Sequence, residues 1–144
     1  MYFEDLNVGD SFTTASQPIT QDEIVAFATE WDPQSFHIDI EGSKQSIFGS
    51  LIASGLHTLA ITHRLFNRLQ LLGPQALAGL GYRNIKFSAP VFPNDILHAI
   101  VTIVEKRVSA KEDRGVVTFQ VRTLTDKDRE VLSFTSDILG RRRE

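Results

Sequence analysis

The longest periodic stretch of the chain decides the fold: residues 52–72 read IASGLHTLAITHRLFNRLQLL. Positions on one stripe recur at spacings of four, three, four and three, which is the period of an α-helix. The stripe consists of Ile52, Leu56, Leu59, His63 and Phe66. Further apolar residues fill much of the remaining circumference, so we expect a long helix that is buried on most sides. Gly73 and Pro74 follow as stop signals.

The second half of the chain is typical of β-strands. Four runs are rich in valine, isoleucine, threonine and phenylalanine, at residues 82–87, 96–108, 115–124 and 130–139. Short charged links join the later runs, as in antiparallel hairpins. A meander of this kind has one face to bury, and the long helix is the obvious partner for it. The sequence therefore predicts an α+β fold in which an antiparallel sheet wraps around a central helix.

Three further local features are predicted outside these elements. A shorter helix should begin after Thr20, because Glu23 stands three residues later and completes a capping box. It should end near Trp31, since the following Asp-Pro pair disfavours helical geometry. Residues 32–46 look irregular. A glycine-rich turn is expected at residues 79–81.

The composition of the chain excludes several classes of function. The chain has 144 residues, which we expect to form one domain over residues 1–144, and 42% of them are hydrophobic. The net charge of -3 argues against a nucleic-acid partner bound through a general basic field. The absence of cysteine excludes disulfides, thiolate catalysis and thiolate-bound zinc. No apolar run is long enough to span a bilayer and no signal segment is evident, so we expect a cytoplasmic protein with no membrane partner.

The segment from Asp32 to His37 is the first candidate for chemistry. It places a carboxylate five residues before an imidazole, in an expected loop after a helix. Such a pair can hold one water, with one member accepting a proton while the other donates. The spacing alone is more often that of a capping aspartate and a half-exposed histidine than that of a catalytic pair.

Gly55 is the second candidate, because it lies near the start of the long helix. A backbone N–H at this position has no partner within the helix, and the helix dipole adds positive potential there. The N–H could stabilise an oxyanion, and the missing side chain would let a carbonyl approach closely. The alternative is a glycine that only permits tight packing against the sheet.

Three motifs together resemble one known family. They are the Asp-x-x-x-x-His loop ending at His37, the run Phe-Gly-x-x-Ile-Ala-x-Gly ending at Gly55, and the strand and turn at residues 84–95, which end in Pro-Val-Phe-Pro-Asn-Asp. Their order and content resemble the MaoC-like hotdog dehydratases, which include the (R)-specific enoyl-CoA hydratases. The resemblance covers nearly the whole chain and implies a hotdog fold.

The resemblance also implies an activity and a site. It makes Asp32 and His37 the catalytic pair, which adds water to a trans-2-enoyl thioester or removes it from the (R)-3-hydroxy form. Gly55 and Ser54 would bind the thioester oxygen. A coenzyme A thioester is the expected substrate, with no separate cofactor and no metal. Which member of the pair is the base stays open.

Several positions depart from the family pattern. Gln34 and Ser35 stand where the family usually has Asn and Pro, and Ser54 precedes Gly55 where many hydratases have His. His63 falls where some hydratases carry a serine that supports the site. It is either a core histidine or a residue of an altered acyl pocket. His57 and His98 are expected to be structural.

The resemblance implies a homodimer or higher homo-oligomer, and a sheet around one helix has long edges that pairing would cover.

Two alternatives stay open: a dehydratase of a branched, dicarboxylic or carrier-protein-bound acyl group, or a non-catalytic acyl-thioester-binding or partner subunit. A hotdog thioesterase is disfavoured because residues 53–72 contain no Asp or Glu. Arg83, Lys86 and the basic run 141–143 are candidate phosphate contacts.

Overall fold

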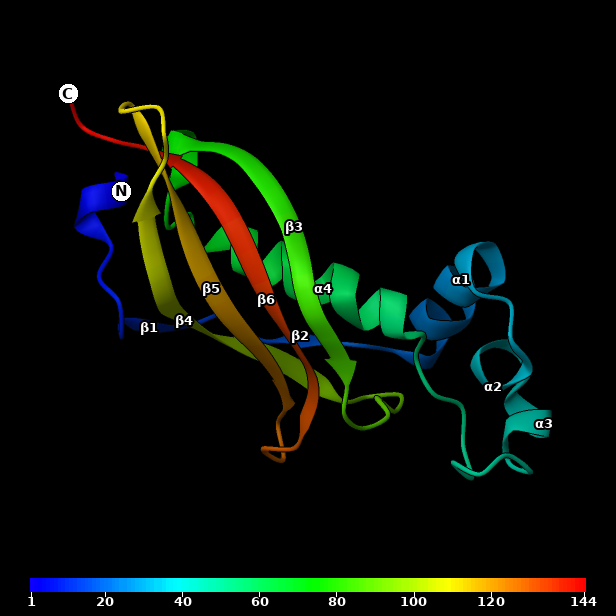
Figure 1. Cartoon of the computed structure of the whole chain (residues 1–144). Helices are drawn as coiled ribbons and strands as arrows, with labels where there is room; N and C mark the ends of the chain where they lie inside the picture. The colour runs from blue at the N-terminus through cyan, green and yellow to red at the C-terminus, as the bar shows by residue number, and fades with distance from the viewer.

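A helix lies in the hollow of a curved antiparallel sheet, as Figure 1 shows for the computed structural model, which describes residues 1–144. The helix is α4 (Gly55–Arg68), and the strands follow the order β1-β4-β5-β6-β3, with β2 also paired to β4. The predicted α+β arrangement is confirmed. The strands are β1 (Ser11–Thr13), β2 (Gln17–Pro18), β3 (Ala76–Phe87), β4 (Ile96–Val108), β5 (Arg114–Thr125) and β6 (Glu130–Arg141).

Strands β4, β5 and β6 match the predicted runs closely, β1 and β2 match no predicted run, and β3 differs from its run. This strand begins at Ala76, and it contains Gly79 and Gly81, which we expected in a turn. The pairing with β6 shifts register between these two glycines, so they mark an irregularity inside a strand rather than its start. A glycine-rich segment has the same local composition whether it forms a turn or an irregular part of a strand. Only the pairing with β6 shows that this segment belongs to a strand.

The meander prediction is correct for β4, β5 and β6, which are consecutive antiparallel neighbours. It is wrong for β3, which pairs with β6 rather than with β4. The chain leaving α4 enters the sheet at the far edge and then crosses to β4. Composition signals that a segment is a strand, but it does not specify the neighbour of that strand.

Helix α4 is shorter than predicted at both ends. Residues 51–54 are not helical, and the hydroxyl of Ser54 caps the helix by accepting a hydrogen bond from the Leu56 N–H at 3.2 Å. The helix ends at Arg68, and Gln70 adopts a positive φ of 52°. The chain therefore stops being helical before Gly73, which begins the short 3₁₀ helix η2 (Gly73–Gln75).

The predicted apolar stripe is wrong. Leu56 is 52% exposed and His63 is also exposed, so the helix is buried on one face only. The buried face consists of His57, Thr58, Ile61, Thr62, Leu65 and Phe66. Threonine is tolerated here because the Thr62 hydroxyl bonds both the Thr58 carbonyl, at 2.8 Å, and the Thr123 hydroxyl, at 2.7 Å.

Three short helices, α1 (Gln21–Trp31), α2 (Ser35–Ile38) and α3 (Ile40–Ser43), lie together beyond one end of α4, whereas the N-terminal turn lies on the opposite side of the molecule (Figure 1). After the 3₁₀ helix η1 (Phe3–Asp5), helix α1 begins with the predicted capping box, since Thr20 and Glu23 bond each other's backbone N–H. Residues 32–46 were expected to be irregular. They instead contain α2 and α3, each a single turn too short for periodicity to reveal.

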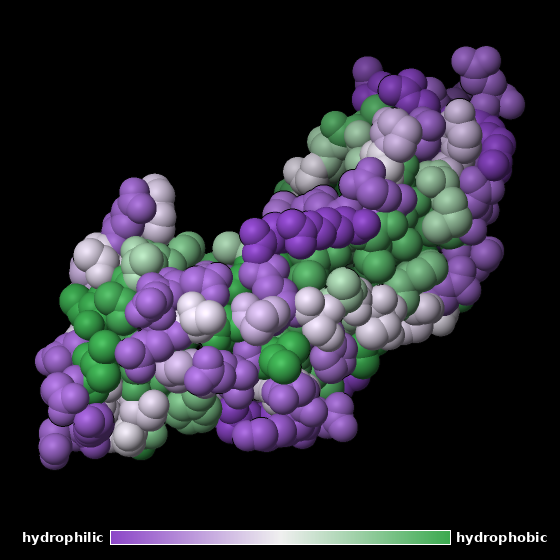
Figure 2. All heavy atoms as spheres, turned by 180° about the vertical axis from the view of Figure 1, so that it is seen from behind, coloured by the Kyte–Doolittle hydropathy of each residue, from purple (hydrophilic) through white to green (hydrophobic).

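The hydrophobic core lies between α4, α1 and the concave face of the sheet. Its largest fully buried side chains include Phe119 and Phe134. The view from behind in Figure 2 also shows hydrophobic surface at the end that carries the short helices, where Ile40 and Ile47 are exposed. None of the helices has the length and hydropathy required to cross a bilayer.

Candidate active site

Asp32 and His37 face each other at the junction of α1 and α2. Asp32 is the residue at which α1 ends, and His37 lies on the single turn of α2. The distance between Asp32 Oδ2 and His37 Nε2 is 3.4 Å. Because α2 turns the chain back on itself, the two side chains meet although four residues separate them in the sequence.

Two hydrogen bonds orient the Asp32 carboxylate. The Ser54 hydroxyl donates to Oδ2 at 2.7 Å, and the Gln34 amide donates to Oδ1 at 2.7 Å. The Ser54 bond, followed by the Gln34 bond, lowers the pKa of Asp32 below its usual value, because both stabilise the charged form. Asp32 is therefore ionised at neutral pH, with both oxygens held in place.

A backbone carbonyl determines the tautomer of His37. Its Nδ1 lies 2.7 Å from the carbonyl oxygen of Ile52, which can only accept a hydrogen bond. Nδ1 must therefore carry a proton, and in the neutral ring Nε2 presents a lone pair toward Asp32. The side chain is almost fully buried, with 4% of the residue exposed, and Phe36 packs against the ring edge.

A cavity of about 480 Å³ opens in front of this pair. Its wall includes Asp32, His37 and Gly55, together with Phe87 from the end of β3. As the first residue of α4, Gly55 has an N–H that no intrahelical bond can satisfy, and no other residue of the chain bonds it. A Cβ at this position would lie 2.8 Å from the Phe87 ring, so any side chain there would have to displace the ring.

The other predicted site residues lie elsewhere. Ser54 is completely buried behind Asp32 and does not line the cavity. His63 is exposed, and its Nδ1 is hydrogen-bonded to the Tyr82 hydroxyl at a second cavity. His57 stacks on Phe27 with ring centroids 4.5 Å apart, and burial lowers its pKa. His98 lies on β4, opposite Leu124 of β5.

Three of the five candidate phosphate contacts are engaged in ion pairs within the chain. Arg142 pairs with Glu4, Arg143 with Asp5, and Arg83 with Asp137. A different cation, Arg129, lies beside the Asp32 cavity, because its guanidinium donates to the Pro90 carbonyl at 3.1 Å, and Pro90 is part of the wall. No group of three or more His, Asp or Glu side chains converges as a metal site would require.

Sequence reasoning missed three contributions to this site. Gln34 was noted only as a departure in the motif, whereas its amide holds Asp32. Phe87 was assigned to a strand with no role, and the Ile52 carbonyl carries no side-chain signal at all. The role of Gln34 has a signal in the sequence, namely a polar side chain two positions after the aspartate that it holds. The other two contacts arise from folding alone.

The fold and the site together define a class: a hotdog protein with a carboxylate–imidazole pair beside the central helix. A Mycobacterium tuberculosis protein with a double hotdog fold has the same architecture, with a TM-score of 0.81 at 17% identity over 99% of this chain and 44% of that one. A family model, the MaoC like domain, matches residues 5–124. The chain belongs to the MaoC-like dehydratase family.

Relatives of known sequence and structure agree with this assignment. The MaoC-like dehydratase from Rhodospirillum rubrum is 39% identical, with a TM-score of 0.93 over 100% of this chain and 99% of that one. The uncharacterised protein YdeM of Bacillus subtilis is 32% identical over 99% of this chain and all of its own length. The 3-hydroxyacyl-thioester dehydratase Z of Mycobacterium tuberculosis is 32% identical over 74% of this chain and 69% of its own length.

Proposed function

We propose that this protein is a hydro-lyase that interconverts 2-enoyl and 3-hydroxyacyl thioesters of coenzyme A. The observation that carries the proposal is that Asp32 and His37 face one cavity beside the free N–H of Gly55. Family membership supports the reaction class, since a relative that this chain covers by two thirds is a 3-hydroxyacyl-thioester dehydratase.

The resting pair is suited to hold one water. When Asp32 is ionised and the His37 ring carries one proton on Nδ1, Oδ2 and Nε2 are two acceptors 3.4 Å apart. A water placed before them donates one proton to each acceptor. Its oxygen lone pair is then free to point at the β-carbon of a bound enoyl group.

Hydration then needs one proton transfer in each direction. The water oxygen forms a bond to the β-carbon, and the π electrons move toward the thioester oxygen. That oxygen becomes enolate-like and accepts the Gly55 N–H, next to the positive end of α4. One water proton passes to the pair and is delivered to the α-carbon as the carbonyl re-forms. The other stays on the new hydroxyl, and dehydration is the reverse.

We assign proton acceptance to His37. Asp32 already accepts bonds from Ser54 and Gln34, which lower its pKa and make it a weaker base. The Nε2 lone pair of His37 is not engaged in this way. Ser54 acts by holding Asp32, because its hydroxyl is buried and fully used by the contacts with Asp32 and Leu56.

We also propose that the protein works as a homodimer. Strand β3 is an edge strand, and it carries Leu80, Ile85 and Phe87, all at least 43% exposed. A long apolar edge of this kind favours pairing with a second copy. Phe87 also lines the Asp32 cavity, so pairing at this edge would enclose the site.

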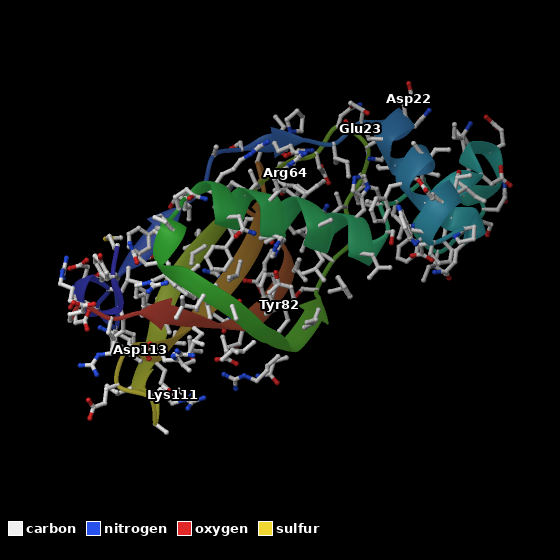
Figure 3. The ribbon with its side chains drawn as sticks, turned by 90° about the horizontal axis from the view of Figure 1, so that it is seen from above. Asp22, Glu23, Arg64, Tyr82, Lys111 and Asp113 are labelled. Carbon is white, nitrogen blue, oxygen red and sulfur yellow. The ribbon has the colours of Figure 1, made fainter.

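The reaction is tested by following the loss of conjugated enoyl absorbance with crotonyl-CoA and longer homologues. We expect turnover by the wild type and a loss of at least about a hundredfold in Asp32→Asn and in His37→Ala. Asp22→Asn, an exposed carboxylate of α1 labelled in Figure 3, is the matched control and should retain activity.

Activity that survives both substitutions would exclude the pair as the catalytic group. A wild type that binds acyl-CoA without turning over any enoyl thioester would instead support the non-catalytic binding subunit. Turnover restricted to branched or carrier-protein-bound substrates would identify the remaining alternative.

A further inference from the structure

A second cavity of about 510 Å³ lies between α4 and the first half of β3. It shares no wall residue with the Asp32 cavity. Most of its wall is apolar or small, including Phe66, Leu77, Ile138 and the two glycines of β3, Gly79 and Gly81. Its volume is within the range of small-molecule sites, so it can accommodate an alkyl segment.

Four polar side chains interrupt this apolar wall: Asn67, Ser136 and the hydrogen-bonded pair of His63 and Tyr82. His63 projects from α4, and its Nδ1 is hydrogen-bonded to the hydroxyl of Tyr82 on β3. Figure 3 shows Tyr82 between α4 and the sheet, where its ring also packs against Phe134. No Asp, Glu, Lys or Arg lines the cavity, and His63 is its only imidazole.

The Tyr82 hydroxyl determines what His63 offers to a ligand. Burial raises the pKa of Tyr82, so the phenol keeps its proton. We assign the phenol as the donor and Nδ1 as the acceptor in their hydrogen bond. A ring that accepts at Nδ1 carries its own proton on Nε2. No residue of the chain accepts a hydrogen bond from Nε2, so this N–H is free to donate to a ligand.

Both cavities contact α4, which fixes their separation. Gly55 lines the first cavity and His63 the second, eight residues later. At 1.5 Å per residue the two positions are about 12 Å apart along the helix axis. An extended chain covers this distance with roughly ten covalent bonds. An acyl group of this length whose thioester lies at Gly55 is therefore long enough to reach His63.

We propose that the second cavity receives the far end of the acyl group, and that His63 selects tails that end in a hydrogen-bond-accepting oxygen, a carboxylate above all. The inference rests on the proposed function and adds a substrate class to it. An alkyl end would leave the Nε2–H of His63 without a partner as it displaced water, which costs free energy. A carboxylate end satisfies that donor and meets no negative side chain.

The test measures binding of saturated acyl-CoA thioesters, which cannot be hydrated. Matched pairs of equal length, one with a methyl end and one with a carboxylate end, are titrated calorimetrically over a ladder of chain lengths. At the best length we expect the wild type to bind the carboxylate form at least about tenfold more tightly, the effect of one charge-assisted hydrogen bond. His63→Leu should abolish or reverse this preference, and Tyr82→Phe should reduce it.

Arg64→Leu is the matched control, since it adds the same side chain one position along α4. Arg64 lies on the side of α4 that faces Glu23, away from Tyr82 (Figure 3), so this variant should keep the wild-type preference. Equal binding of both forms at every length, no binding of either form, or an unchanged preference in His63→Leu would overturn the inference. Failure of the proposed function has a different signature, namely acyl-CoA binding with the expected preference but no hydration of crotonyl-CoA.

Discussion

Asp32 is held by donors from two different segments, Gln34 in the next turn and Ser54 at the start of α4. Ser54 has two roles, because the same hydroxyl that donates to Asp32 also caps α4. The orientation of the carboxylate and the start of the helix are therefore coupled through one oxygen. His37 is fixed in a similar way by the Ile52 carbonyl, only two residues before Ser54.

Replacing Ser54 with alanine should raise the pKa of Asp32 toward its usual value, because the bond that lowers it most is lost. A carboxyl titration followed by carbon NMR of labelled aspartate measures this shift. Activity should also fall, since the carboxylate is no longer held. Ser16→Ala, which changes an exposed serine, is the control. An unchanged Asp32 titration would contradict the assigned role of Ser54.

The same variant should lose stability in a pH-dependent way. The lost N-cap costs about 1 kcal/mol at any pH. The folded-state pKa of Asp32 lies below its unfolded value, so its stabilisation is present above the unfolded value, about 3.9, and is lost as pH falls through the folded value. Urea unfolding should therefore show a larger deficit for Ser54→Ala at neutral pH than in acid. A deficit that grew in acid would contradict this sign.

Helix α4 connects the site to the core, since its first residue faces the cavity and its buried face packs on the sheet. The start of the helix has no spare room, because Gly55 lies against the ring of Phe87. The buried face meets the sheet at Phe119, whose ring packs edge-on against Phe66 with centroids 5.1 Å apart.

Gly55→Ala should reduce kcat/KM by roughly ten- to a hundredfold, because the new methyl displaces the Phe87 ring or the thioester oxygen from the helix start. The enoyl absorbance assay measures the loss, and circular dichroism checks that the fold is retained. Adding Phe87→Ala removes the obstructing ring and should restore part of the activity. If the double variant were no better than Gly55→Ala alone, crowding by Phe87 would not be the cause.

Phe119→Ala should lower the free energy of unfolding by about 3–5 kcal/mol, the usual cost of deleting a buried aromatic side chain. The residue is 1% exposed and belongs to the main core cluster. Urea denaturation measures the change. Val108→Ala, an exposed position near the end of β4, should change stability by less than about 1 kcal/mol.

The whole molecule has one unpaired apolar edge, β3, next to the proposed site. Sedimentation or light scattering should therefore give twice the 16.1 kDa mass of one chain. Leu80→Lys combined with Ile85→Lys should shift the protein toward monomer, because the charges would meet across the paired edges. The double variant Val104→Lys and Val108→Lys, on exposed positions of β4, should remain dimeric. A wild-type monomer would contradict the dimer proposal.

The sequence alone determined the elements that depend on local signals. The capping box at Thr20 predicts the start of α1, and the β-branched runs predict β4, β5 and β6 to within two residues. The loop motif and the glycine at a helix start were enough to identify Asp32, His37 and Gly55 as candidate site residues. These signals are readable because each one lies within a few consecutive residues.

Only the tertiary structure decided which face of α4 is buried, which strand pairs with β3, and what holds the catalytic candidates. The stripe failed because Thr58 and Thr62 find hydroxyl and carbonyl partners in the core, while Leu56 and His63 face outward. Ser54 reaches Asp32 across 22 residues of sequence, and His63 reaches Tyr82 across 19. Such contacts depend on how distant segments pack, and local residue preferences contain no information about that packing.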